Sequence, residues 1–310
     1  MLIEYHRTML ADRVRNAALH AALERVIVPG ETTVADIGAG TGLIGFLARR
    51  LGAREAFLYE HADVMVLAER LAKTNRIRGL HFFHEHSTNI LDPVPVDVVV
   101  SETLGNFALE EFIIDTLEDA RRFLKPGGIV IPGRLEQFVA PVTSDRFHRE
   151  LCVWDEVGFG LDFDDAKRMG FNNLYVRQVT PDDLLDGMRS AQRWDRVDFS
   201  RRNDRHRRGK VQWTPRAKAT VYGFAVWWRC ELVPGVDIST APDAPRTHWD
   251  QIYLPLLEPI ALARGDALAL RLDVLASLEQ GIGVRWTAER VGADGGKTRQ
   301  ALDIGKGFLG

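Results

Sequence analysis

A buried strand that runs into a glycine-rich turn constrains the fold of this chain more than any other feature. Residues 33–42 read Thr-Val-Ala-Asp-Ile-Gly-Ala-Gly-Thr-Gly, and a helix is expected from Leu43 to Leu51. A second apolar strand, Ala56–Tyr59, ends at Glu60. Glycines let a ligand approach the backbone, the helix N-terminus offers unpaired N–H groups, and the acid can accept both hydroxyls of a ribose. This order of elements predicts a nucleoside-binding α/β unit.

Two nucleoside cofactors fit this turn. Gly40, Gly42 and Gly45 satisfy the Gly-x-Gly-x-x-Gly spacing of dinucleotide-binding proteins, so NAD is a competitor. Against NAD, Asp36 stands two residues before the first glycine, Gly38. The resulting Asp-x-Gly-x-Gly-x-Gly pattern is associated with S-adenosylmethionine. In that case the turn packs on the methionine moiety, and no pyrophosphate has to be neutralised.

Helical and strand patterns alternate through the first 132 residues. Alternating β and α units predict a mainly parallel, doubly wound sheet. Beyond those already named, we expect helices over Met9–Ile27, Ala62–Arg76 and Phe112–Leu124, and strands over His81–His84, Val96–Val100 and Ile129–Ile131.

After Pro132 the pattern changes from helical periodicity to alternation. Regular alternating strands separated by Pro and Gly turns suggest a β-barrel or a sandwich. The chain therefore divides into a nucleoside-binding domain, 1–132, and a β-barrel domain, 133–310, with an insertion at about 155–192. The clearest strands are Leu135–Val142, Lys218–Leu232, Leu268–Leu275 and Gly281–Glu289, with a shorter one at Asp250–Leu254.

The insertion contains two short helical stretches, Asp164–Gly170 and Pro181–Gln192. Leu184, Leu185 and Met188 would be apolar and poorly covered there. An apolar projection from a barrel is a candidate for a self-association arm.

An acidic loop follows the strand Val96–Val100. Residues 101–111 read Ser-Glu-Thr-Leu-Gly-Asn-Phe-Ala-Leu-Glu-Glu, so that Glu102 directly follows the strand and Glu111, nine residues later, opens the next helix. Carboxylates held close together repel each other unless a cation lies between them, and a planar guanidinium fits two of them well. The alternative is that Glu111 only complements the helix dipole and that Glu102 is solvated.

Composition narrows the class of protein. The net charge of −3 provides no general attraction to nucleic acid or anionic membrane. Cys152 and Cys230 form no metal-ligand spacing, and two reduced thiols suit the cytoplasm. We see neither a signal peptide nor an apolar run of about 20 residues that could span a membrane. The arginine-rich run Arg201–Lys210 predicts a solvated hairpin, with a patch for an acidic or nucleic-acid partner as the alternative.

Taken in order, these segments resemble the protein arginine N-methyltransferases over nearly the whole chain. The resemblance rests on Met9-Leu-Ala-Asp-Arg-Val-Arg15, the glycine turn, the two glutamates with their nine-residue separation, and Thr247-His248-Trp249. It implies an S-adenosylmethionine-dependent transfer of methyl to an arginine guanidinium of a protein or peptide, with mono- or asymmetric dimethylation. Trp154–Phe163 resembles the start of the family's dimerisation arm, which implies a homodimer.

The resemblance also implies residue roles. Arg15 would bind the methionine carboxylate, Met9 would line the methyl-transfer site, and His248 would pair with Asp12. No metal is implied. The implied catalytic residues are Asp12, Glu102, Glu111 and His248, and the implied substrate-binding residues are Glu102, Glu111 and Trp249. The implied cofactor-binding residues are Met9, Arg15, Asp36, Gly38, Gly40, Thr41, Gly42, Leu43, Glu60, His61, Ser87, Thr88 and Glu102.

Three segments depart from the family pattern. The aromatic helix before the first motif is reduced to Tyr5, and residues 87–89, Ser-Thr-Asn, replace an acid near adenine. The loop reads Glu-Thr-Leu-Gly-Asn from Glu102 onward, where the family usually has Glu-Trp-Met-Gly-Tyr. Small polar groups thus replace an aromatic wall. A methyltransferase for a small guanidine, amine or hydroxyl therefore remains an alternative, as do an NAD-dependent oxidoreductase and a catalytically silent binding module.

Overall fold

Five parallel strands form the sheet of the first domain. The structure is a computed structural model that describes residues 3–307. The strand order is β3-β2-β1-β4-β5, so the direction of winding reverses between β1 and β4. Ligands of such sheets bind at this switch point, outside the carboxyl ends of the strands. The strands are β1 Thr33–Ile37, β2 Glu55–Tyr59, β3 Leu80–Phe83, β4 Val96–Val100 and β5 Leu124–Ile131.

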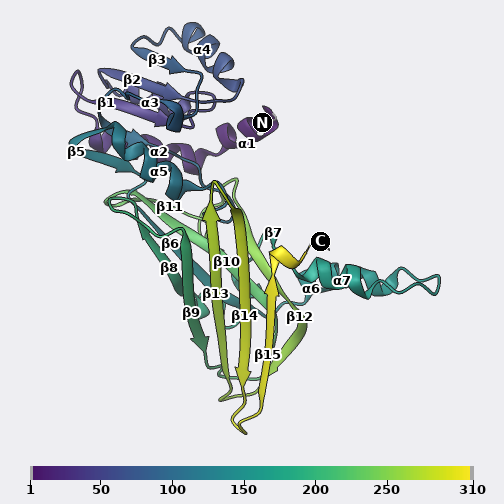
Figure 1. The fold of residues 1–310 in the computed structure, drawn as a ribbon. Coiled ribbons are helices and arrows are strands. Elements are labelled where there is room, and N and C mark those ends of the chain that lie inside the picture. The colour runs from purple at the N-terminus through teal and green to yellow at the C-terminus, as the bar shows by residue number, and fades with distance from the viewer. Residues whose placement is uncertain (1–2, 308–310) are drawn as a thin grey trace.

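Helices connect these strands, as the alternating pattern predicts (Figure 1). All five residues of β1 and four of the five in β4 are buried, which is typical of parallel strands covered on both faces. No helix among residues 3–307 combines the length and the apolar character needed to cross a membrane. The helices are α1 Ile3–Ala11, α2 Arg13–Val26, α3 Leu43–Arg50, α4 Val64–Thr74 and α5 Ile113–Ala120, with short 3-10 helices η1 Ser87–Asn89 and η2 Arg121–Phe123.

The single helix expected over Met9–Ile27 is wrong, because the chain breaks at Asp12. The backbone of Asp12 is extended, with φ −75° and ψ 94°, and its carboxylate accepts the N–H of Arg15 at 2.9 Å. Aspartate is a preferred N-cap because its side chain satisfies a donor that the helix leaves free. The cap begins α2 at Arg13, so that α1 and α2 are separate helices.

The second domain is antiparallel, as expected, and its long strands extend away from the parallel sheet (Figure 1). One sheet has the order β7-β12-β10-β6-β8, with β11 beside β10, and the other has the order β15-β14-β13-β9. The parallel sheet ends at Ile131, and the first antiparallel strand begins at Arg134. The strands are β6 Arg134–Val142, β7 Tyr175–Arg177, β8 Gln192–Asp198, β9 His206–Trp213, β10 Ala219–Val233, β11 Val236–Ser239, β12 Gln251–Leu262, β13 Ala267–Ser277, β14 Gly281–Val291 and β15 Lys297–Asp303.

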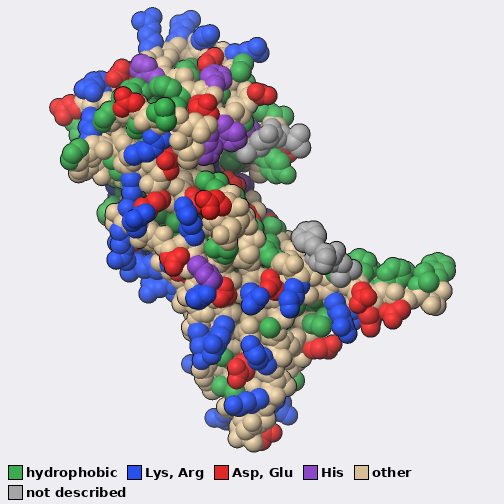
Figure 2. Space-filling model, viewed as in Figure 1, with side chains coloured by type: hydrophobic (Ala, Val, Ile, Leu, Met, Phe, Trp, Pro, Cys, Tyr) green, Lys and Arg blue, Asp and Glu red, His purple; other side chains and the backbone are tan. Residues whose placement is uncertain are grey.

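A projecting arm leaves this domain after β6 and contains α6 Arg146–Leu151, the 3-10 helix η3 Val153–Glu156 and α7 Asp164–Phe171 (Figure 1). Hydrophobic side chains gather at its tip (Figure 2). The most exposed apolar residues of the arm are Val153, Phe159 and Leu161, and Phe159 is 95% exposed.

The expectation that Leu184, Leu185 and Met188 would be the uncovered apolar residues is wrong. Leu184 and Leu185 are buried, and Met188 is half-buried. The reason is that their segment returns to the sheet, where Leu184 forms a β-bridge with Val142. The carbonyl of Asp183 also accepts the N–H of Thr143 at 2.8 Å.

The run Arg201–Lys210 is mostly exposed, as expected for a solvated segment between strands. Its second half belongs to β9, and several of its arginines pair with carboxylates. Arg202 donates to Glu118 at 3.1 Å and Arg205 pairs with Asp115, both on α5. These pairs link the two domains.

Candidate active site

The glycine turn after β1 has the backbone that the sequence pattern requires. Gly38, Gly40 and Gly42 have φ values of 73°, 54° and 83°, a left-handed region that favours glycine. The carboxylate of Asp36 accepts the N–H of Gly45, in the first turn of α3, at 2.9 Å. Gly38 is exposed, so its backbone is open to close approach by a ligand.

Asp36 holds the glycine turn from the protein interior, and its side chain is not exposed to solvent. Its side chain is fully buried, and burial raises its pKa to about 7, with the charge of Glu60 acting in the same direction. The sequence resemblance implied direct cofactor binding by Asp36. In the structure Asp36 is enclosed by protein and holds the turn through Gly45, and its contact with the cofactor stays a prediction.

Glu60 stands at the carboxyl end of β2, beside the turn. One carboxylate oxygen accepts the N–H of Gly40 at 3.1 Å, and the other accepts the N–H of Ala62 at 2.9 Å. Each oxygen has a second lone pair for a ligand hydroxyl. The neighbouring His61 is exposed, with its Nδ1 3.5 Å from Glu60. The two other predicted residues of the turn, Thr41 and Leu43, are buried and half-buried.

The first helix covers the turn with a histidine that the sequence analysis missed. A Cβ atom placed on Gly40 would lie 3.2 Å from Cε1 of His6, so the imidazole rests directly on the glycine backbone. His6 is buried, burial lowers its pKa, and its Nε2 has no hydrogen-bond partner within the described residues. Met9 follows one turn later and is half-buried. A single histidine on a short helix carries no recognisable sequence signal.

Ser87 and Thr88 lie in η1, after β3. Ser87 is buried, and its carbonyl accepts a hydrogen bond from Arg122. The Thr88 hydroxyl is 2.7 Å from Nδ1 of His86, whose ring centre lies 5.5 Å from that of His61. Thr88 is thus linked through His86, which was not predicted, to His61, the neighbour of the predicted ribose acid Glu60.

Glu102 and Arg15 form a buried ion pair. Their side chains are 4% and 8% exposed, and two guanidinium nitrogens contact the same carboxylate oxygen. The other oxygen of Glu102 accepts the N–H of Leu104 at 3.2 Å. Arg15 was expected on the carboxylate of a cofactor. Its five donors allow a second anion to bind beside Glu102.

Glu111 lies close enough to Glu102 for their charges to interact. Glu111 is exposed at the residue level, yet the protein packed around its carboxyl group raises its pKa to about 7, and the charges of Glu102 and Glu110 add to the effect. The expected helix start at Glu111 is wrong, because Phe112 takes a left-handed backbone with φ 57° and α5 begins at Ile113. This break turns Glu111 out of the helix.

Glu110, which the sequence analysis passed over, shapes the loop between the two glutamates. A Cβ atom on Gly105 would lie 2.0 Å from a Glu110 carboxylate oxygen, so any larger residue there would force the Glu110 side chain to move. Glu110 is half-buried, and burial raises its pKa. The nine-residue spacing selected Glu111 and gave no information about its neighbour.

The structure brings Asp12 and His248 together from opposite domains. One Asp12 oxygen accepts the backbone N–H of His248 at 2.7 Å and lies 2.8 Å from its Nδ1. Burial alone would raise the pKa of Asp12, but hydrogen bonds from Arg15 and His248 lower it below the ordinary value. The cap of α2 thus also anchors the Thr-His-Trp loop.

Three donors of the antiparallel domain hold the acidic loop. The indole N–H of Trp249 donates to the carbonyl of Leu104 at 2.8 Å, and that of Trp228 donates to the carbonyl of Gly105 at 3.0 Å. The N–H of Asp250 donates to the Asn106 side chain at 2.9 Å. Trp249 was expected to bind substrate. It is 5% exposed and uses its one donor on the loop, so its place is that of an anchor.

Two family models match the chain. The model of the arginine methyltransferase oligomerization subdomain matches residues 134–281, and that of the ribosomal protein L11 methyltransferase (PrmA) matches residues 17–142. The arginine N(omega)-methyltransferase of Streptomyces achromogenes is 31% identical over 86% of this chain and 75% of its own. This chain is a protein arginine N-methyltransferase family member. The protein arginine N-methyltransferase 6 of Xenopus tropicalis is 28% identical over 93% of this chain and 92% of its own.

Solved structures of the family share the fold. The Trypanosoma brucei PRMT1 enzyme–prozyme heterotetramer with AdoHcy has a TM-score of 0.85 at 22% identity and covers 97% of this chain and 98% of its own. The Arabidopsis thaliana protein arginine methyltransferase 10 has a TM-score of 0.80 at 23% identity and covers 98% of both chains. Because these matches cover nearly the whole chain, they include both the parallel sheet and the antiparallel domain.

Proposed function

We propose that this chain transfers a methyl group from S-adenosylmethionine to a guanidinium nitrogen of arginine. The observation that carries the proposal is the position of Glu102 directly after β4, in a loop whose Thr103 would lie 3.3 Å from a Cβ atom on Gly38 of the glycine turn, with Glu111 close enough for the two charges to interact. Two carboxylates at a nucleoside site form a receptor for a planar cation. Membership of the arginine methyltransferase family supports the same activity.

The residues at the turn fit S-adenosylmethionine. Glu60 would accept the ribose hydroxyls, the exposed backbone of Gly38 would contact the methionine moiety, and Arg15 would bind its carboxylate. NAD fits less well, because a pyrophosphate at the N-terminus of α3 would approach the carboxylates of Asp36 and Glu60. The N–H donor that Gly45 would offer a phosphate already binds Asp36.

When bound, the cofactor supplies an electrophilic methyl carbon, and the chain positions the acceptor and removes a proton. A guanidinium, with its pKa above about 12, is a poor nucleophile, so its charge has to be held while one nitrogen attacks. Glu102, fixed by Arg15, and Glu111 would clamp the cation. Glu111, with its pKa near 7, is suited to accept the proton, and the Asp12–His248 pair is a second candidate.

Assembly and location belong to the same proposal. We propose a homodimer in which the arm, with Val153, Phe159 and Leu161, contacts a second copy. The oligomerization subdomain that matches residues 134–281 supports it. We propose a cytoplasmic location, where Cys152 and Cys230 stay as the free thiols they are in the structure. Residues 1–132 would bind the cofactor, and residues 133–310 would hold the acceptor.

A small guanidine is the second candidate for the acceptor. Thr103 and Asn106 stand where larger aromatic residues are usual in the family, which leaves the mouth of the site without an aromatic wall. The printed name of the Streptomyces relative specifies arginine without specifying a protein. On a protein or peptide, mono- and asymmetric dimethylarginine would be the products.

The test is methyl transfer from isotope-labelled S-adenosylmethionine to a panel of acceptors. The panel contains arginine-rich peptides, free arginine, and amines and alcohols without a guanidine. We expect label on a guanidine nitrogen, identified by fragment masses. Label only on an amine or a hydroxyl would overturn the proposal, as would an absence of any transfer by a folded protein that binds S-adenosylhomocysteine.

A further inference from the structure

The side chain of Asn16 links the first helix to the buried arginine of the site. Asn16 lies near the start of α2 and is half-buried. Its amide nitrogen donates to the carbonyl of Leu10, in the last turn of α1, at 3.0 Å. Its amide oxygen accepts an N–H from Nη1 of Arg15 at 2.9 Å. An amide carries both a donor and an acceptor, so one orientation of Asn16 serves both partners.

Asn16 and Glu102 contact different nitrogens of the Arg15 guanidinium. Nε and Nη2 contact one oxygen of Glu102, whereas Nη1 donates to Asn16. Nη1 and Nη2 each carry two N–H groups, and within residues 3–307 one on each has no partner. Two N–H groups of one guanidinium match the two oxygens of a carboxylate. Arg15 can therefore bind Glu102 and a second carboxylate together.

We propose that Asn16 positions the guanidinium of Arg15 for the carboxylate of the cofactor's methionine moiety. This inference rests on the proposed function, in which Arg15 binds that carboxylate, and it adds a residue that acts through Arg15. Glu102 alone does not define the plane of the guanidinium, because both of its contacts meet one oxygen. A hydrogen bond that orders a long side chain in advance lowers the entropic cost of binding a ligand.

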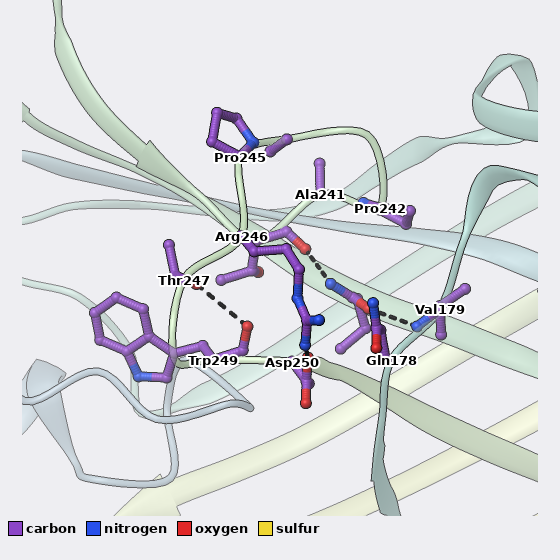
Figure 3. Close-up of a pocket in the computed structure, with 12 residues that line it drawn as sticks. Gln178, Val179, Ala241, Pro242, Pro245, Arg246, Thr247, Trp249 and Asp250 are labelled. Carbon is purple, nitrogen blue, oxygen red and sulfur yellow. Dashed lines mark hydrogen bonds and ion pairs between the residues drawn. The ribbon is translucent and has the colours of Figure 1, made fainter. Parts of the chain in front are cut away.

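The backbone from which Asn16 acts is held by both domains. The cap residue of α2, Asp12, accepts the backbone N–H of His248 at 2.7 Å. The loop around His248 is closed by its neighbours, since the Thr247 hydroxyl donates to the carbonyl of Trp249 at 3.2 Å (Figure 3). The start of α2 is thereby fixed to the antiparallel domain, and the amide of Asn16 has a defined position.

The bond from Asn16 to Leu10 allows a second role, which the experiment has to separate from the first. This bond crosses the break between α1 and α2, and α1 carries His6, which rests on Gly40 of the glycine turn. A role confined to holding α1 would affect binding of the whole cofactor. A role through Arg15 affects only the part of the cofactor that has the carboxylate.

Two ligands and two variants separate these roles. S-adenosylhomocysteine has the amino-acid carboxylate, whereas methylthioadenosine has the same adenosine and a thioether without the amino acid. Asn16→Leu removes both hydrogen bonds, and Asn16→Asp keeps an acceptor for Arg15 and adds a negative charge. The control is Asn75→Leu, because the amide of Asn75 donates in a similar way to the carbonyl of Leu71, at 2.8 Å, at the end of α4. The Kd of each ligand is measured by calorimetry, without any methyl acceptor.

We expect Asn16→Leu to raise the Kd for S-adenosylhomocysteine roughly 5- to 30-fold, as the loss of a hydrogen bond to a charged group would produce. The Kd for methylthioadenosine should stay within about twofold of the wild type, because this ligand has no carboxylate for Arg15. Asn16→Asp should weaken S-adenosylhomocysteine at least as much, since its charge repels the carboxylate of the ligand. Asn75→Leu should match the wild type for both ligands.

Two outcomes would overturn the inference and leave the proposed function intact. One is unchanged binding of S-adenosylhomocysteine by Asn16→Leu. The other is an equal loss of affinity for both ligands, which would limit Asn16 to holding α1. Failure of the wild-type protein to bind S-adenosylhomocysteine would overturn the proposed function itself.

Discussion

At Glu111, burial and neighbouring charge act together on one carboxyl group. Glu102 forms a buried ion pair with the guanidinium of Arg15, and the negative charge of Glu102 opposes ionisation of Glu111. The two acids thus have different environments although they serve one cation. Such a difference is how a pair of carboxylates divides the tasks of binding charge and accepting a proton.

The raised pKa of Glu111 predicts a pH dependence. Only the ionised form binds a guanidinium and accepts its proton, so kcat/KM for the acceptor should rise as pH increases through about 7 and fall below it. Glu111→Gln should lower kcat by about 10²- to 10⁴-fold while S-adenosylhomocysteine binding stays within a few-fold. A flat pH profile between pH 6 and 8, measured at low acceptor concentration, would contradict the role of Glu111.

At the scale of elements, the acidic loop is held mainly by the other domain. Its carbonyls at Leu104 and Gly105 accept indole N–H groups from Trp249 and Trp228, and Glu110 packs against Gly105 from within the loop. A buried carbonyl that loses its donor costs about 1–3 kcal/mol, so each indole contributes to one loop conformation. The antiparallel domain therefore positions a site whose acids belong to the parallel sheet.

Trp228→Phe tests this positioning, because it removes the donor to Gly105 and keeps most of the ring. Trp213→Phe is a matched control, since its indole N–H donates to the carbonyl of Ser190 at 2.6 Å, in the segment that returns to the antiparallel sheet, and not to the acidic loop. Both variants should lose about 1–2 kcal/mol of unfolding free energy in urea titrations. Only Trp228→Phe should also lower kcat. Equal kcat values for the two variants would show that the Trp228 hydrogen bond has no positioning role.

At the scale of the whole molecule, the arm exposes large apolar side chains to solvent. Hydrophobic side chains gather at its tip (Figure 2), and Phe159 and Leu161 are among the exposed apolar residues of the arm. Exposed apolar residues on a projection mark a contact with another molecule, and a second copy offers a closed, symmetric arrangement.

Phe159→Asp should therefore shift a dimer toward the monomer. Light scattering after size exclusion should show a mass that falls toward 34.8 kDa per particle, because a charge in an apolar contact is costly. Leu278→Asp, at an exposed leucine in the turn between β13 and β14, is the control and should keep the wild-type mass. A wild-type protein that is already monomeric would contradict the proposed homodimer.

Much of the architecture was predictable because local patterns encode it. Strand Val96–Val100 was predicted to the residue, since a valine-rich run of five residues between turns is too short for a helix. Helix boundaries were less predictable. Asp12 and Phe112 both interrupt expected helices, the first through a side-chain cap and the second through a left-handed backbone. The spacing of apolar residues along the sequence reveals neither the cap at Asp12 nor the left-handed backbone at Phe112.

The sequence by itself determined the parallel sheet, the antiparallel domain, the glycine turn and the spacing of Glu102 and Glu111, because each depends on residues that are close along the chain. Only the tertiary structure decided which side chains share the site. His6 over Gly40, the pairing of Arg15 with Glu102 and the hydrogen bond from Trp228 to Gly105 all depend on how distant segments pack. Packing of this kind follows from the whole core, and no local pattern records it.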